Sequence, residues 1–438
     1  MIHAAHPGSG AARRSALEFL LLVCRRDSSV ASLHTGLQRL REQGGSGALL
    51  TVTGHHGLLG LVLTRLQREG VLGAIPDSQT RLWEASLRTL RLQAAVWDLE
   101  RDRILELLGR CGLGAVVLKG AALRLTTYRE SVERQFGDLD LLLHPEEVNP
   151  AQEALLAAGY RPPNAAKQEA YLRHHFHLPL QSAAGFVVEL HWALIQPDSP
   201  FQLDSDGFLR RARLHPRTAG PPTRVPAVED MVLHLASQNL EDSFSRLRRL
   251  VDLDRVVAAE GGLDWQALMD EGYAGNLGNV LAHSLTLARR LLGTEVPRQI
   301  ERRISLPPVT RVHIALLRPV RSVLDPAEPR RAAADGLLYL WLLSGGRARL
   351  AHLGRVLREG GDPMSWMWLG RAAPDEGRPP WRSRFARILR LAAYQLALYL
   401  AAPLGGLAEL LRKGSGGRAA ELPRAGEGRT KLNSQGSE

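Results

Sequence analysis

The sequence predicts a mixed α/β fold in which a small mixed sheet is embedded between predominantly helical N- and C-terminal regions. Aromatic residues make up only 5% of the chain against 45% hydrophobic residues overall, so Leu, Ala and Val must fill the core, which favours helices. Apolar residues recur near a 3.6-residue spacing in both outer regions, whereas short strand-like runs occupy the middle. With 438 residues, more than one core is expected.

The N-terminal region, residues 1–110, reads as helical. Apolar residues keep the helical period over three segments, residues 15–25, 49–70 and 80–112. Gly112 and Gly114 follow the last of them in the manner of a helix C-cap. The hydrophobic period changes directly after these glycines.

Residues 111–225 are predicted to form the sheet-containing core. A short apolar run at 115–119 is of strand type, and a helix follows the glycine after it. A second strand is expected at 138–144 and a second helix at 146–159. Residues 175–181 and 185–194 are rich in strand-forming residues around the turn Ser-Ala-Ala-Gly, which predicts a hairpin. The expected order is therefore β-α-β-α-β-β.

Helices return after Pro226 and define a helical domain over 226–372. The tail at 412–438 has hardly any large apolar residues, which predicts disorder. Between them, 373–411 is predicted to hold a linker and an amphipathic helix. The helical stretch 386–412 favours a core helix, with an interfacial helix on an anionic membrane surface as the alternative.

The chain is basic, with a formal net charge of +11 carried almost entirely by arginine. Such charge permits binding to nucleotides, nucleic acid or an anionic membrane, but a solvated basic surface is the favoured interpretation and no strong nucleic-acid signal accompanies it. Four lysines occur, at positions 119, 167, 413 and 431. Lys119 therefore stands out in an arginine-rich chain.

Two cysteines, Cys24 and Cys111, are too few for a disulfide framework or a four-cysteine zinc site. The first residues lack the charged-then-apolar pattern of a signal peptide, and no uninterrupted transmembrane span appears. We therefore expect a cytoplasmic protein.

Asp138 and Asp140 stand two residues apart on a predicted strand, so their side chains leave the same face of it. Two neighbouring carboxylates are costly to bury without a cation. Glu189 lies on another predicted strand and shares a face with His191. If the two strands are adjacent, Glu189 completes a three-carboxylate cluster suited to Mg²⁺ or Mn²⁺.

An anion cradle is expected at Lys119, Gly120 and Ala121, where a strand meets the start of a helix. Free backbone N–H groups and the helix dipole attract phosphate at such a place, and a glycine allows close approach. Lys119 is expected to contact the triphosphate, and Arg134, just before the acidic pair, is the second candidate for phosphate contact.

These motifs together resemble the uncharacterised bacterial nucleotidyltransferase family of the polymerase-β-like superfamily. The resemblance is carried by VLKGAALRLTTYRESVERQFGDLDLLLH, by GFVVELHWAL and by the helices that follow, and covers about residues 15–295. It implies transfer of a nucleoside monophosphate from an NTP to an unidentified acceptor, with Asp138, Asp140 and Glu189 as the catalytic metal ligands. The turn departs from the usual Gly-Gly or Gly-Ser, because Ala121 follows Gly120.

Several other polar residues leave alternatives open. His174, His175 and His177 are interpreted as polar residues lining a cleft in preference to a metal site. His191 either orients the acceptor or acts as a general base, or is simply satisfied by a nearby carboxylate. Asp252 is expected to form an ion pair on a helix surface in preference to binding a ligand.

His55 and His56, at a predicted helix start, receive no chemical role. His234 and Arg249 belong to helices expected to pack over the sheet. Two rival functions remain beside the transferase: an inactive binding or scaffold protein with the same fold, and an enzyme that modifies a peptide or protein.

Overall fold

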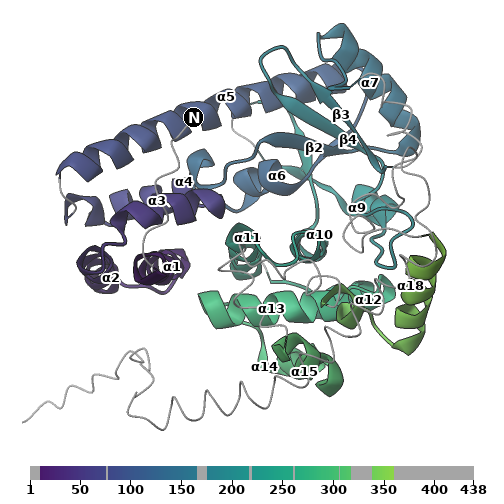
Figure 1. Cartoon of the computed structure of the whole chain (residues 1–438). Helices are drawn as coiled ribbons and strands as arrows, with labels where there is room; N and C mark the ends of the chain where they lie inside the picture. Colours follow the sequence, from purple (N-terminus) through teal and green to yellow (C-terminus); the bar gives the residue numbers. More distant parts are fainter. Residues whose placement is uncertain are drawn as a thin grey trace, which may run out of the picture. The chain divides into compact units, whose positions relative to one another are not determined.

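A six-stranded mixed sheet lies among the helices, which confirms the predicted fold class (Figure 1). The computed structural model describes residues 10–74, 77–164, 175–216, 220–259, 262–304, 306–316 and 338–359. All of these belong to one compact unit, Met1–Arg387. The predicted linker, amphipathic helix and disordered tail lie outside the described residues. Within the described part of the chain, no helix has both the length and the apolar character needed to cross a membrane.

The strands follow the order β3-β4-β2-β1-β6-β5 across the sheet. Their bounds are β1 Val116–Val117, β2 Asp138–Leu142, β3 His177–Gln181, β4 Val187–His191, β5 Arg213–His215 and β6 Thr223–Val225. The predicted hairpin is present as the antiparallel pair β3–β4. The strands β5 and β6 extend the sheet beyond the prediction, with β6 parallel to β1.

The two strands that carry the predicted carboxylates, β2 and β4, are neighbours in the sheet. Strand β2 pairs in parallel with β4, and the register sets Asp140 opposite Glu189. Alternation along β2 sends Leu139 and Leu141 into the apolar core, where both are fully buried, so Asp138 and Asp140 leave the opposite face. The apolar half of this strand thereby dictates where its carboxylates lie.

Five helices precede the sheet: α1 Gly10–Cys24, α2 Val30–Glu42, α3 Ser46–His55, α4 Leu59–Arg68 and α5 Asp77–Arg110. The predicted continuous helix at 49–70 is wrong at its middle, because Gly57 adopts a φ of +65° and separates α3 from α4. Helix α2 lies in the region predicted to be helical but outside the three segments named above, and its buried Leu33, Leu37 and Leu40 keep a helical spacing. Gly112, with a φ of +75°, follows α5 as predicted.

The later helices cover the sheet and build outward from it. They are α6 Lys119–Thr126, α7 Val148–Ala157, α9 Ser205–Arg211, α10 Val228–Glu241, α11 Leu247–Ala258, α12 Trp265–Ala274, α13 Gly278–Leu292, α14 Arg298–Arg303, α15 Pro308–Leu316 and α18 Gly346–Glu359. Helices α10 and α11 lie below the strands in Figure 1, and α13 packs under them. One cluster of buried apolar side chains joins the N-terminal helices, the sheet and α13.

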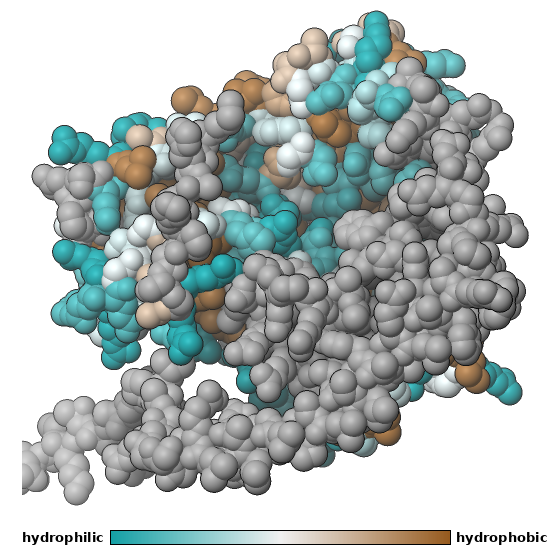
Figure 2. Space-filling view, viewed as in Figure 1, coloured by the Kyte–Doolittle hydropathy of each residue, from teal (hydrophilic) through white to brown (hydrophobic). Residues whose placement is uncertain are grey.

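Hydrophilic residues gather in the middle of the face drawn in Figure 2, below the strands, whereas hydrophobic patches follow the upper edge along α5. The exposed apolar residues of α5 are Leu82, Leu92, Val96 and Leu99. The predicted boundaries near residues 110 and 225 fall where helix gives way to sheet and sheet gives way to helix. These domain boundaries stay predictions.

Candidate active site

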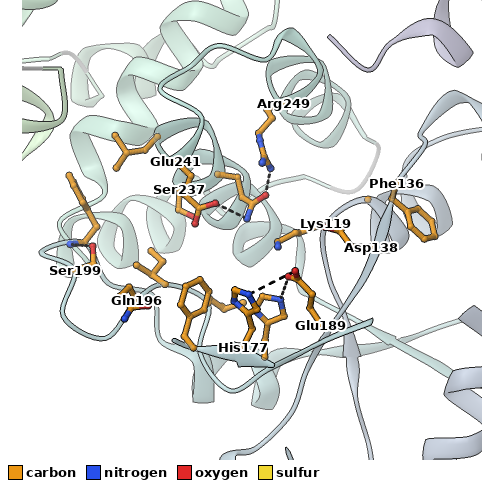
Figure 3. Close-up of a pocket in the computed structure, with 18 of the residues that line it drawn as sticks. Lys119, Phe136, Asp138, His177, Glu189, Gln196, Ser199, Ser237, Glu241 and Arg249 are labelled. Carbon is orange, nitrogen blue, oxygen red and sulfur yellow. Dashed lines mark hydrogen bonds and ion pairs between the residues drawn. The ribbon is translucent and has the colours of Figure 1, made fainter. Parts of the chain in front are cut away.

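A cavity of about 300 Å³ opens between the sheet and the helices α10 and α11. We call one side the sheet wall, formed by Lys119, Gly120, Asp138, His177, Glu189 and His191. We call the other the helical wall, formed by Ser237, Gln238, Glu241, Arg248 and Arg249. Figure 3 shows Glu189 and His177 on the strands, with Ser237, Glu241 and Arg249 on the helices opposite.

The three predicted carboxylates converge at the sheet wall. Asp138, Asp140 and Glu189 each contribute an oxygen, and these atoms lie within 4.8 Å of one another. Asp140 is buried and Asp138 is the most exposed residue of β2. A set of carboxylate oxygens at this spacing fits a hard divalent cation such as Mg²⁺ or Mn²⁺.

Two nitrogen-bearing side chains, those of Lys119 and His191, approach this cluster. Nζ of Lys119 lies 2.5 Å from Oδ1 of Asp140. Nε2 of His191 lies 2.9 Å from the same oxygen and 3.2 Å from Oε2 of Glu189. Lys119 was expected to contact a triphosphate, but its ammonium is paired with Asp140. For His191, the structure favours the interpretation of a histidine satisfied by carboxylates.

The pKa values of the two β2 aspartates are shifted in opposite directions, because their neighbours differ. Burial alone would raise the pKa of Asp140, but the charge of Lys119 and the hydrogen bond from His191 outweigh it and hold that pKa well below its usual range. Desolvation and the neighbouring Asp140 raise the pKa of Asp138 to about 6. Of the two β2 carboxylates, Asp140 is thus compensated by partners and Asp138 is crowded.

A second group of metal-binding atoms overlaps the first. His177, Glu189 and His191 each offer an atom within 4.8 Å of the others. Burial and the nearby His191 lower the pKa of His177 to about 4. The two residues that accompany His177 in this group come from β4. The interpretation of the histidine run from the sequence did not consider residues of that strand. His175 stacks edge-on against His177 at 5.8 Å between ring centroids, and His174 lies outside the described residues.

The strand-to-helix turn has an unusual backbone. Lys119 has a φ of 47°, a left-handed conformation that costs a non-glycine residue about 1 kcal/mol or more. A Cβ on Gly120 would meet Nη1 of Arg134 and Cβ of Phe136, each at 2.9 Å. Glycine is therefore needed here to pack against these two side chains. Ala121 is buried in the first turn of α6, where it can offer only its backbone.

Arg134 belongs to a buried ion pair. Its Nε donates to both carboxylate oxygens of Asp252, at 2.8 and 3.0 Å, and the hydroxyl of Tyr128 donates to the same carboxylate at 2.6 Å. The expectation of a surface ion pair at Asp252 is wrong, because the residue is fully buried and its partner comes from the segment before β2. This pair joins α11 to the sheet.

The helical wall was largely missed from the sequence. Arg249 binds Asp242 and Gln238, and Gln238 donates to Glu241 at 3.3 Å. Desolvation raises the pKa of Glu241, although Lys119 and Arg249 oppose that shift. The available signal was the run of polar residues at 237–239 within an otherwise apolar helix.

His56, which received no chemical role, helps to dock this wall. Its Nδ1 accepts a hydrogen bond from the backbone N–H of Leu247 at 3.3 Å, and the Arg246 guanidinium donates to the carbonyl oxygen of His55. Burial lowers the pKa of His56 to about 3, which keeps the ring neutral and able to accept. The turn between α3 and α4 thus receives the start of α11.

Comparison with known proteins identifies a family. No curated protein matches the sequence. A family model described as uncharacterised nucleotidyltransferase matches residues 44–293, which is more than half of the 438 residues. The matched segment contains both walls of the cavity.

Proposed function

We propose, from the premise that this chain belongs to the family of uncharacterised nucleotidyltransferases, that it transfers a nucleoside monophosphate from an NTP to an acceptor with the help of Mg²⁺. The acceptor is a hydroxyl of a small molecule, peptide or protein. The polymerase-β-like relationship that the motifs imply is part of the same proposal.

The observation that carries this proposal is the convergence of Asp138, Asp140 and Glu189 within 4.8 Å at one side of a cavity. Such a cluster is compatible with the Mg²⁺ that NTPs carry. When bound, the metal would supply positive charge to an attacking hydroxyl and to the leaving pyrophosphate. The chain's own residues hold the two reactants beside that charge.

The protein groups have separate tasks. The paired Lys119 and His191 keep Asp140 ionised, so the cluster stays negative and ready for a cation. The cavity between the walls receives the nucleotide. Positioning contributes most of the catalysis expected for this class of reaction.

The test is pyrophosphate release from each of the four NTPs with Mg²⁺ and a cell extract as the source of acceptor. Asp138→Asn removes a ligand charge while relieving crowding, so it should stay folded and lose at least about a hundredfold in turnover, or about 2.7 kcal/mol of transition-state stabilisation.

Asp270→Asn is the matched control, because Asp270 is exposed on α12 and does not line the cavity. It should turn over as the parent does. A parent that releases pyrophosphate no faster than Asp138→Asn with every NTP would support the scaffold function in place of the enzyme.

A further inference from the structure

Four cationic side chains line the cavity, and three of them already have a carboxylate partner. Lys119 is paired with Asp140. Arg134 is paired with Asp252, and Arg249 with Asp242. A group that is committed to a carboxylate within the protein must exchange that partner before it can bind a phosphate.

Arg248 is the exception among these four. Within the described part of the chain its guanidinium has no hydrogen bond or ion pair, and its Nε is buried without a partner. Burial and the nearby Arg134 lower the pKa of Arg248 to about 10, although the more distant charges of Asp252 and Asp242 oppose that shift, and Arg248 stays charged at neutral pH. A largely desolvated charge without a partner is costly, and a polyanion in the cavity would offset that cost.

The fold makes room for this guanidinium. A Cβ on Gly57 would lie 2.9 Å from Nη1 of Arg248, and Gly57 has a φ of +65° that favours glycine. The residues just before Arg248 also contact the residues just before Gly57. Leu247 donates a hydrogen bond to His56, and Arg246 donates one to the carbonyl oxygen of His55. The α3–α4 turn therefore holds Arg248 at the edge of the cavity.

We propose that Arg248 binds the phosphate chain of the NTP from the helical wall, in the role that the sequence suggested for Lys119 and Arg134. This proposal rests on the proposed function. Lys119 and Arg134 are each paired with an aspartate, whereas Arg248 lines the same cavity without such a pair, near enough to Asp138 of the carboxylate cluster for its charge to lower the pKa of that residue. The planar guanidinium offers paired donors that match phosphate oxygens.

The test uses calorimetric titration with Mg²⁺-tripolyphosphate and with each NTP. Arg248→Gln should weaken binding of both kinds of probe by at least about tenfold, because a charge-assisted contact is lost. Arg248→Lys should retain part of the affinity, since it keeps the charge without the fork. Arg39→Gln, which removes the same charge from an exposed position on α2, should bind as the parent does.

Thermal unfolding without ligand separates a binding role from a structural one. Removing an unpaired, desolvated charge should leave the melting temperature unchanged or raise it, while the increase in melting temperature caused by tripolyphosphate should shrink. A fall in the ligand-free melting temperature together with parental affinity would overturn the proposal.

The two proposals can fail separately. If the parent releases pyrophosphate and Arg248→Gln binds every probe as tightly as the parent, the role of Arg248 is refuted and the transferase stands. If the parent binds neither tripolyphosphate nor any NTP, both are refuted.

Discussion

The two walls of the cavity owe their positions to different kinds of contact. The sheet wall is set by backbone register, since pairing of β2 with β4 alone brings Asp140 opposite Glu189. The helical wall depends on side-chain contacts between distant segments, such as the hydrogen bond from Leu247 to His56. The carboxylates of the sheet wall are thus positioned by a short stretch of chain, whereas the position of the helical wall depends on contacts between segments far apart in the sequence.

The largest effect is expected where the two walls are joined. Arg134→Gln would leave the buried Asp252 with Tyr128 alone, so the free energy of unfolding should fall by about 3–5 kcal/mol. Arg210→Gln breaks an exposed pair with Asp204 and should cost less than about 1 kcal/mol. Urea unfolding measures both. Equal losses would mean that the buried pair does not join the walls.

Within the sheet wall, the two aspartates of β2 should differ. Asp140→Asn leaves Lys119 and His191 without their shared carboxylate, so the ligand-free protein should lose about 2 kcal/mol of stability. Asp138→Asn relieves crowding and should lose none. Both should abolish turnover. Denaturant unfolding of the two variants checks this. Equal stability of the two variants would show that the contacts of Asp140 with Lys119 and His191 do not stabilise the folded protein.

A buried histidine of helix α13, His283, should make the stability of the folded protein fall in acid. Burial lowers the pKa of His283 from 6.5 to about 3. The unfolded chain takes up this proton as the pH falls through 6.5 and the folded chain does not, so stability falls as the pH is lowered from 6.5 toward 3, with a slope that approaches about 1.4 kcal/mol per pH unit.

His283→Leu removes this proton uptake. Relative to the variant, the parent should lose about 1 kcal/mol between pH 6.5 and 5.5 in urea unfolding, because the unfolded histidine is already half protonated at pH 6.5. His191 on the sheet side is different, because the hydrogen bonds from His191 to Asp140 and Glu189 outweigh burial and raise its pKa. Parallel pH profiles for parent and variant would contradict a neutral, buried His283.

The smallest effect tests how the α3–α4 turn positions the helical wall. Gly57→Ala places a methyl group against Arg248 and strains a φ of +65°, so it should cost about 1 kcal/mol of stability and weaken tripolyphosphate binding a few-fold. Gly44→Ala is matched, because Gly44 has a φ of +67° and no atom within 4 Å of the added Cβ. It should cost the same stability without changing affinity, which calorimetry resolves.

Local patterns allowed the sheet wall to be predicted. Alternation of acidic and leucine residues places Asp138 and Asp140 on one strand face, and the apolar neighbours of Glu189 identify a second core strand. Strands β5 and β6 were missed, since three residues are too few for a period to be recognised. The break at Gly57 was missed because apolar residues continue on both sides of it.

The partners of the cationic residues could not be predicted, for a physical reason. Whether Arg134 or Arg248 meets a carboxylate depends on which aspartate the folded chain brings beside it, and Asp252 is 118 positions from Arg134. Spacing along the chain carries no information about such a pair. The sequence therefore identifies residue types that can bind phosphate, and the assignment of Lys119 and Arg134 to phosphate contact stays a prediction.

The contact between the α3–α4 turn and the start of α11 spans 191 positions of the chain. Closing so long a loop is entropically slow, and the apolar core of β2 and β4 can assemble from much closer segments. The carboxylate cluster is therefore expected to form early in folding and the second half of the cavity late. A chain emerging from the ribosome acquires its N-terminal turn long before residue 248, so that turn waits for its partner until α11 has been synthesised.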